Sequence, residues 1–359
     1  MKIIHCSDLH LDSKMETNLS KEKAKERKNE ILLTFEKMIQ YAKEAGVKII
    51  IIAGDMFDKK NITQKAKKMV KSQIVLNPEI DFIYLKGNHD EINFLEDDEE
   101  IPSNLKMFND QKWISYEYED ITISGIEFGE QAEYNIYNSL ILDKNKTNIV
   151  VMHGQESQRD IKDKTEIINL KELKNKNIDY LALGHIHSYK QEKLDNRGIY
   201  CYSGCLEGRG FDECGDKGFV LLNIENKKIG TEFIPIAKRT LYEVKVDITG
   251  VTENYEIEQK IEEATKDILK ENLVKIILTG KVEIGTTRDI DYLIKKYEEN
   301  FYCIKIYDET TANIDYMKHQ NDASLKGEFI RLILEQDITE EEKSKIINTG
   351  IKALLGEEV

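Results

Sequence analysis

Five short polar motifs in this sequence carry side chains that could bind metal ions. They combine aspartate, asparagine and histidine, and five of the seven histidines of the chain lie within them. In chain order the motifs are Asp8-Leu-His10, Gly54-Asp55, Gly87-Asn88-His89-Asp90, His153-Gly154 and Gly184-His185-Ile-His187. Carboxylate, imidazole and amide donors together suit Mn²⁺, Fe²⁺ or Zn²⁺ better than they suit Ca²⁺ or an ion that prefers thiolates.

Each motif alone can be explained as a loop or a turn, but the whole set cannot. His185 and His187 follow a predicted strand, and alternate residues of an extended chain point the same way. Two cations held close together need a shared anionic ligand, and Asp55 is the natural bridge. The sequence therefore predicts a binuclear metal site. Its candidate ligands are Asp8, His10, Asp55, Asn88, His153, His185 and His187.

The other two histidines and the cysteines are expected to be structural. His5 lies in an apolar strand and is expected in the core, whereas His319 is expected on the surface. The five cysteines contain no Cys-x-x-Cys pair, so we expect them to be reduced.

The motifs follow predicted strands that alternate with helices. A helix is predicted over 21–45, because Ser20 can cap its first turn and Gly46 can end it. Residues 47–53 form an apolar run typical of a strand buried on both faces, and it ends directly in Gly54-Asp55. Further predicted elements are strands at 2–6, 81–85, 121–128, 148–152 and 180–183 and a helix at 63–74. This alternation predicts an α/β fold, whose ligands bind at the carboxyl ends of the strands.

The chain is expected to contain three parts. Residues 1–236 would form the first domain and finish with two hairpins, whose turns lie at 195–198 and 226–228. Residues 238–312 read as a small α+β cap domain with the order β-α-β-α-β. Residues 321–359 read as two helices, 325–335 and 340–355, with Thr339 and Glu342 forming a capping box for the second. These helices either pack on their own chain or offer a docking surface to a partner.

The charge of the chain limits how it could bind nucleic acid. Its formal net charge is −15, whereas proteins that grip nucleic acid through their own surface usually carry a basic excess. The substrate is therefore a small phosphate ester, or the metal ions and a partner supply the missing positive charge. No apolar run is long enough to cross a bilayer and no signal peptide is evident, so we expect a cytoplasmic protein without a membrane partner.

In this order the motifs resemble the signature blocks of the calcineurin-like metallophosphoesterase superfamily, over about residues 1–236. The resemblance implies a central β-sheet sandwich flanked by helices. It also implies a division of the ligands between two metal ions: Asp8, His10, Asp55 and His187 for one, and Asp55, Asn88, His153 and His185 for the other. His89 and Asp90 would be the catalytic residues. His89 would face the substrate phosphate, held near Asp90 or Asp8, and stabilise the transition state or protonate the leaving oxygen.

Within the superfamily the chain is similar to the DNA repair nuclease branch, the SbcD-like subunits of the SbcCD complex. The resemblance rests on Asp8-Leu-His10, on Gly54-Asp55-Met-Phe-Asp58, on the cap and on the two terminal helices. The block 202–213, which follows the last histidine motif, also resembles bacterial members of this branch. It implies a manganese-dependent nuclease that acts on DNA ends and forms a homodimer. Its partner would be a coiled-coil ABC ATPase that binds the terminal helices. A small-molecule phosphodiesterase or phosphatase of the same superfamily is the alternative, and a non-catalytic scaffold is the third hypothesis.

Overall fold

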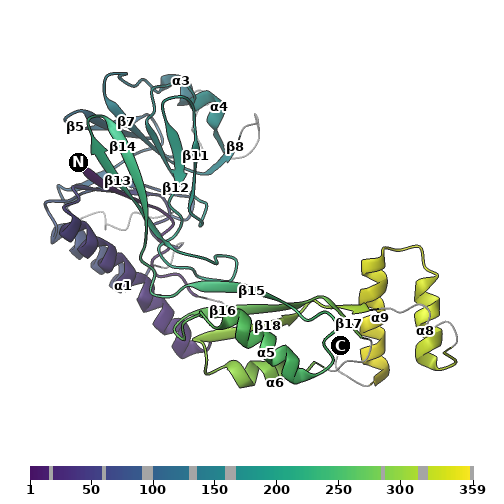
Figure 1. Ribbon diagram of the computed structural model, residues 1–359. Helices are drawn as coiled ribbons and strands as arrows, with labels where there is room; N and C mark the ends of the chain where they lie inside the picture. The colour runs from purple at the N-terminus through teal and green to yellow at the C-terminus, as the bar shows by residue number, and fades with distance from the viewer. Residues whose placement is uncertain are drawn as a thin grey trace. The chain divides into compact units, whose positions relative to one another are not determined.

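The computed structural model describes residues 1–15, 19–58, 62–90, 100–128, 136–157, 167–283, 288–313 and 322–355. The chain divides into two compact units, Met1–Thr240 and Leu241–Val359. Figure 1 shows the elements of both units. Within the described residues, no helix is both long and apolar enough to cross a membrane.

The first unit is built on two six-stranded sheets. The first sheet has the order β14 (Lys228–Pro235), β13 (Gly218–Glu225), β1 (Lys2–Cys6), β2 (Ile49–Ala53), β3 (Asp81–Leu85), β4 (Leu105–Met107). The second has the order β11 (Lys190–Lys193), β12 (Ile199–Tyr202), β10 (Tyr180–Gly184), β7 (Thr147–His153), β6 (Ile121–Gly125), β5 (Ile114–Tyr118). The strands that precede the motifs, β1, β2 and β3 in one sheet and β7 and β10 in the other, pair in parallel with one another within each sheet.

The two sheets form a sandwich with helices on its outer faces. In β2, Ile49 and Ile51 belong to the apolar layer that contains residues of both sheets, whereas Ile50 and Ile52 pack on the helix side. This alternation follows from the two-residue repeat of a strand. Helices α1 (Lys21–Ala45) and α2 (Gln64–Val75) contribute to the layer on the first sheet, and α3 (Ile136–Ser139) and α4 (Leu170–Leu173) to the layer on the second. The predicted α/β sandwich is confirmed.

Local sequence features explain where the long helix begins and ends. The Ser20 hydroxyl accepts a hydrogen bond from the Lys23 backbone N–H, and Gly46 ends α1 in the left-handed conformation with φ 70°. Both expected hairpins are confirmed, as β11–β12 and β13–β14. The expected strand 121–128 ends earlier, at Gly125, and the three-residue strands β4, β8 (Gln155–Ser157) and β9 (Ile167–Asn169) were not predicted, because such short segments show no periodicity.

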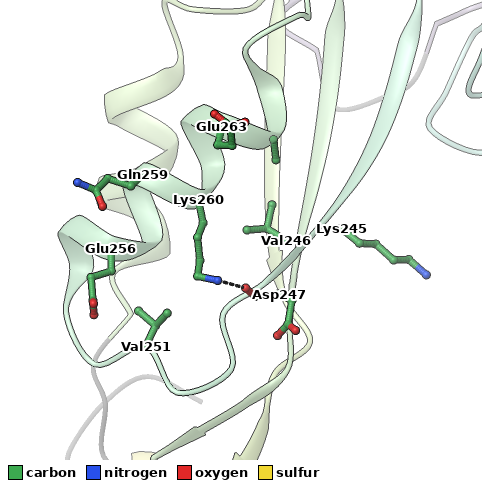
Figure 2. A pocket seen from close by; sticks show the side chains of 9 residues that line it. Lys245, Val246, Asp247, Val251, Glu256, Gln259, Lys260 and Glu263 are labelled. Atoms are coloured by element: carbon green, nitrogen blue, oxygen red, sulfur yellow. Dashed lines mark hydrogen bonds between the residues drawn. The ribbon is translucent and has the colours of Figure 1, made fainter.

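The second unit contains a small parallel sheet of β15 (Leu241–Asp247), β16 (Leu273–Thr279) and β18 (Cys303–Asp308). Helices α5 (Asn254–Thr265) and α6 (Ile290–Tyr297) pack on it, and β17 (Lys281–Glu283) pairs with β19 (Thr311–Asn313). A pocket of about 440 Å³ lies between β15 and α5, where the Lys260 ammonium donates a hydrogen bond to the Asp247 carbonyl at 2.8 Å (Figure 2). The β-α-β-α-β order expected for the cap is present.

The terminal helices α8 (Leu325–Leu334) and α9 (Glu340–Leu355) pack on each other around a small cluster of Ile330, Ile347 and Ile351. The capping box is confirmed, since Glu342 accepts from the Thr339 N–H and Thr339 accepts from the Glu342 N–H. Large apolar side chains also remain exposed on these helices. They are Leu325, Leu332, Ile346 and Leu354. The two helices therefore pack on each other and also keep exposed apolar side chains that a partner could contact.

Candidate metal centre

The five motifs converge at one edge of the sandwich, because the strands that carry them end there. Backbone hydrogen bonds tie the first two loops together: the Asp8 N–H donates to the Gly54 carbonyl and the His10 N–H to the Asp55 carbonyl, both at 3.0 Å. The second sheet joins through the His185 N–H, which donates to Asp8 Oδ1 at 2.8 Å. Residues that are 177 positions apart in the sequence thus meet at one site.

Four of the candidate ligands adopt left-handed backbone conformations that L-amino acids rarely occupy. The φ angles are 51° at Asp8, 43° at His10, 53° at Asp55 and 101° at His185. Such conformations cost roughly 1–3 kcal/mol each and persist only where the surrounding structure fixes them. Backbone strain of this kind is often found at functional sites.

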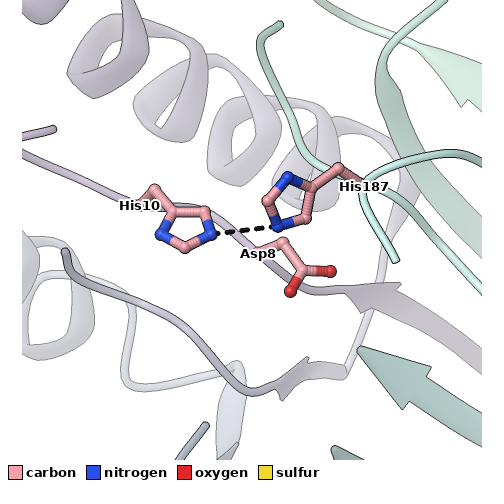
Figure 3. A group of neighbouring side chains, drawn as sticks. All are labelled: Asp8, His10 and His187. Carbon is pink, nitrogen blue, oxygen red and sulfur yellow. Dashed lines mark hydrogen bonds between the residues drawn. The ribbon is translucent and has the colours of Figure 1, made fainter. Parts of the chain in front are cut away.

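One cluster brings Asp8, His10 and His187 together (Figure 3). The Nε2 atoms of the two histidines face each other at 3.2 Å, and each side chain offers one donor atom within 4.8 Å of the others. Asp8 and His10 are buried and His187 is partly exposed. These three side chains follow β1 and β10, and so come from both sheets.

A second cluster joins Asp8, Asp55 and His153. His153 Nε2 lies 3.3 Å from Asp55 Oδ2 and 3.0 Å from Asn88 Oδ1. The same Asp55 oxygen lies 3.8 Å from His10 Nε2. Asp55 therefore contacts ligands of both clusters, which is the position expected of a bridging carboxylate.

His185 lies beside the second cluster. Its ring is edge-on to that of His153, with 5.5 Å between the ring centroids. The structure therefore brings together all seven candidate ligands that the sequence indicates.

The chemistry of this donor set fits divalent metal ions. Burial lowers the pKa of His10 to about 3, so its imidazole is neutral and has a lone pair to offer. Burial also raises the pKa of Asp8, which means that a buried carboxylate at this position needs a cation beside it. A set of carboxylate, imidazole and amide donors is typical of Mn²⁺, Fe²⁺ and Zn²⁺ sites.

Gly54 makes the close approach of the two sheets possible. Its φ is +92°, and a Cβ atom at this position would lie 2.0 Å from His153 Nδ1. No other residue type would leave space for the imidazole. The His153 Nδ1–H instead donates to the Ala53 carbonyl at 2.9 Å, which turns Nε2 toward Asn88 and Asp55.

His89 and Asp90 lie next to each other in the sequence but occupy different environments. His89 Nδ1 is 3.2 Å from Asp58 Oδ1, and this contact raises the pKa of His89. Asp90 is buried, and its carboxylate accepts the backbone N–H groups of Met56, Phe57 and Gly87. The carboxylate facing His89 is therefore Asp58, rather than Asp90 or Asp8 as expected from the sequence, because Asp90 is engaged in holding the two loops.

The sequence did not indicate that Glu213 and Arg209 touch the candidate ligand His187. Glu213 Oε1 lies 2.7 Å from His187 Nδ1, and Arg209 Nη2 lies 3.1 Å from the same nitrogen. Burial alone would raise the pKa of Glu213, but hydrogen bonds from His187 and Arg209 outweigh burial and hold this pKa below its usual range. Both residues follow the last motif in a loop without regular spacing, so only the folded structure reveals the contact.

The structural residues behave as expected where they are described. His5 is fully buried, and its Nδ1 lies 2.8 Å from the Tyr180 hydroxyl. All five cysteines are thiols rather than members of disulfides. His319 lies outside the described residues.

Comparison with known proteins places this geometry in a family. The chain is 28% identical over 297 residues to the uncharacterized metallophosphoesterase YhaO of Bacillus subtilis, a match that covers 78% of this chain and 72% of that protein. It is 28% identical to the SbcD component of the nuclease SbcCD of Staphylococcus saprophyticus, over 88% of this chain and 92% of the relative. It is 23% identical to the DNA double-strand break repair protein Mre11 of Sulfolobus acidocaldarius, a match that covers 89% of this chain and 85% of that protein. Residues 1–189, which contain every motif, match the family described as calcineurin-like phosphoesterase. The chain belongs to the calcineurin-like phosphoesterase family.

Proposed function

We propose that the chain is a metal-dependent phosphodiesterase that acts as a DNA repair nuclease. The observation that carries the proposal is the convergence of seven ligand side chains, with Asp55 Oδ2 between His10 and His153. The similarity to relatives named as a component of SbcCD and as Mre11 supports DNA as the substrate. Manganese is the proposed metal, because these ligands suit it and the resemblance to the nuclease branch implies it.

The proposed ligand sets share Asp55. Asp8, His10, Asp55 and His187 would hold one ion, and Asp55, Asn88, His153 and His185 the other. When bound, two such ions lower the pKa of water and polarise the phosphoryl oxygens. The protein contributes ligand orientation: His153 directs Nε2 into the site because its Nδ1–H donates to Ala53.

His89 is the proposed general acid. Its imidazole is partly exposed beside the ligands, and Asp58 favours the protonated form by holding Nδ1. A protonated imidazole can stabilise the negative charge of the reacting phosphoryl group and give its proton to the leaving oxygen. Asp90 supports this step indirectly, because it fixes the backbone of the loop that carries His89.

A partner would resolve the mismatch between an acidic chain and an acidic substrate. The exposed apolar side chains of α8 and α9 are the proposed docking surface for an SbcC-like coiled-coil ABC ATPase. The ATPase would then supply much of the affinity for DNA, while this chain supplies the metal centre. A homodimer and a cytoplasmic location belong to the same proposal.

The test is digestion of an end-labelled linear DNA duplex by the purified chain with Mn²⁺, beside the variant His89→Ala. We expect the wild-type chain to shorten the duplex and the variant to be at least roughly 100-fold slower, since positioned acid catalysis contributes that much. Both proteins should bind the same amount of Mn²⁺. An unchanged rate in His89→Ala would refute the role of His89.

A small-molecule phosphodiesterase is the second candidate, and the net charge of −15 favours it. Hydrolysis of bis(4-nitrophenyl) phosphate distinguishes the two functions. If the chain with Mn²⁺ hydrolyses this diester but leaves duplex and single-stranded DNA intact, with and without a coiled-coil ATPase partner, the nuclease proposal is wrong.

A further inference from the structure

Two of the histidines that direct Nε2 into the metal centre, His153 and His187, are held in different ways. His153 Nδ1 faces the Ala53 carbonyl at 2.9 Å, and a carbonyl can only accept a hydrogen bond. The backbone therefore holds a proton on Nδ1 of His153. His187 Nδ1 instead faces two side chains, Glu213 Oε1 at 2.7 Å and Arg209 Nη2 at 3.1 Å.

These two neighbours of His187 require opposite tautomers. A hydrogen bond to Glu213 requires the proton on Nδ1, which leaves a lone pair on Nε2, the atom that faces His10 at 3.2 Å. A hydrogen bond from Arg209 requires a lone pair on Nδ1 and places the proton on Nε2. Nε2 must give up this proton before it can bind a metal ion, so the neighbour that prevails affects the affinity of His187 for the ion.

The geometry favours Glu213. Its carboxylate is buried and accepts three hydrogen bonds from Arg209: Nη2 at 2.8 Å and Nε at 3.1 Å to Oε1, and the backbone N–H at 2.7 Å to Oε2. The guanidinium is thereby directed to the carboxylate, and the shorter contact of His187 is the one to Glu213. Carboxylate partners of this kind orient histidine ligands in many metal sites.

We propose that Glu213, anchored by Arg209, is a positioning residue that keeps the proton of His187 on Nδ1 and leaves Nε2 for the metal ion shared with Asp8 and His10. This inference rests on the proposed metal centre. It assigns a role in metal affinity to a loop that follows the last motif of the family and contains no ligand.

The test is a titration of the metal-free chain with Mn²⁺. Binding is measured by calorimetry and by the paramagnetic resonance signal of the Mn²⁺ that remains free. Wild type should bind two ions. In Glu213→Gln we expect the affinity of one site to fall roughly 10- to 100-fold, as it does when partners of histidine ligands are removed, and the other site to be unchanged. The neutral amide holds Arg209 less firmly and accepts the Nδ1–H less strongly.

Glu207→Gln is the matched control. Glu207 lies on the same loop, is buried, and accepts from Arg27 at 3.1 Å and Thr34 at 2.7 Å, whereas the hydrogen bonds found among the described residues do not join it to a candidate ligand. This variant should keep both Mn²⁺ affinities. If Glu213→Gln and Glu207→Gln bind Mn²⁺ with the same two affinities, the inference about Glu213 is wrong, whereas the proposed metal centre is not affected. A wild-type chain that binds no Mn²⁺ would overturn the metal centre and the inference with it.

A second measurement reads the tautomer directly and needs no metal. Long-range ¹H–¹⁵N correlation spectra of the ¹⁵N-histidine-labelled, metal-free chain distinguish the two nitrogens of each ring, and His187→Gln assigns the His187 resonances. Wild type should carry the proton on Nδ1. In Glu213→Ala, Arg209 can donate to Nδ1, so we expect the proton on Nε2. The same tautomer in both proteins would contradict the role of Glu213.

Discussion

At the scale of single residues, the candidate metal centre depends on close contacts between side chains and backbone atoms of different loops. Sequence analysis could identify all seven candidate ligands, because each is an aspartate, asparagine or histidine at the end of a predicted strand. It could not show that Asp58 rather than Asp90 faces His89, since that choice depends on which backbone N–H groups the Asp90 carboxylate meets. It could not show Glu213 either, because 26 residues separate it from His187 in the sequence.

Gly54→Ala should destabilise the first unit and abolish Mn²⁺ binding. The added Cβ would lie 2.0 Å from His153 Nδ1, and φ +92° strains any residue other than glycine. Gly215→Ala is the control: its φ is +86°, but nothing lies within 4 Å of the Cβ position. We expect Gly215→Ala to lose roughly 1–2 kcal/mol in urea unfolding and to keep its metal ions. Equal Mn²⁺ binding by the two variants would contradict this account.

At the scale of secondary structure elements, the sequence predicted most of the longer strands and helices but not β5 or the three-residue strands of the first unit. Helix α1 shows its capping Ser20 and its terminal Gly46 in the sequence, and β2 is an uninterrupted apolar run. Strands β4, β8 and β9 each have three residues, which is too few to show a two-residue repeat. Their positions are determined by pairing partners that lie elsewhere in the chain, such as β3 for β4.

Helix α2 is predicted to contribute DNA affinity despite the acidic chain. It contains Lys65, Lys67, Lys68 and Lys71 and no acidic residue. Its N-terminus contacts the loop that carries Asp8 and His10, because the Thr63 N–H donates a hydrogen bond to Asp12 Oδ2 of this loop at 2.6 Å. The double variant Lys67→Ala/Lys68→Ala should bind duplex DNA more weakly and reduce the slope of log affinity against log salt concentration by about 2.

Hydrolysis of bis(4-nitrophenyl) phosphate should be unchanged in this double variant, because a small diester lacks the neighbouring phosphates that lysines of a helix contact in DNA. Lys171→Ala/Lys174→Ala, at α4 on the other sheet, is the matched control and should keep its DNA affinity and salt slope. If both double variants bind DNA as the wild type does, α2 plays no part in the interaction.

A buried cluster of charged side chains joins α1 to Arg239, and its contribution to the stability of the fold depends on pH. Glu30 accepts from Arg27 at 2.6 Å and from Arg239 at 2.8 Å. Burial would raise the pKa of Glu30, but hydrogen bonds from Arg239, Lys238 and Arg27 lower it to about 2. A pKa below the unfolded value of 4.5 stabilises the fold above pH 4.5, and this contribution is lost as the pH falls toward 2.

Glu30→Gln should therefore cost on the order of 3 kcal/mol near pH 7, because Arg27 and Arg239 remain buried without this partner. Urea unfolding at pH 7, 5, 4 and 3 measures the difference from wild type. We expect this difference to shrink below pH 4.5. A difference that stays constant over the whole range would show that Glu30 acts through packing rather than charge.

At the scale of the whole molecule, the two compact units are expected to respond differently to metal. All seven candidate ligands belong to Met1–Thr240. Calorimetric unfolding should show two transitions. Mn²⁺ should raise the midpoint temperature of one, and a chelator should lower it again. The midpoint of the other should not change with either addition. At 100 times the dissociation constant, an ion stabilises its unit by about 2.7 kcal/mol. Equal shifts of both transitions would contradict an independent second unit.

The division of the ligands between two sheets has a consequence for biosynthesis. Asp8, Asp55 and Asn88 follow strands of the first sheet, and His153, His185 and His187 follow strands of the second. A nascent chain on the ribosome carries the ligands of the first sheet long before residue 187 has emerged. The proposed nuclease would thus stay inert until residue 187 has left the ribosome, and metal capture would mark the moment at which its two sheets have joined.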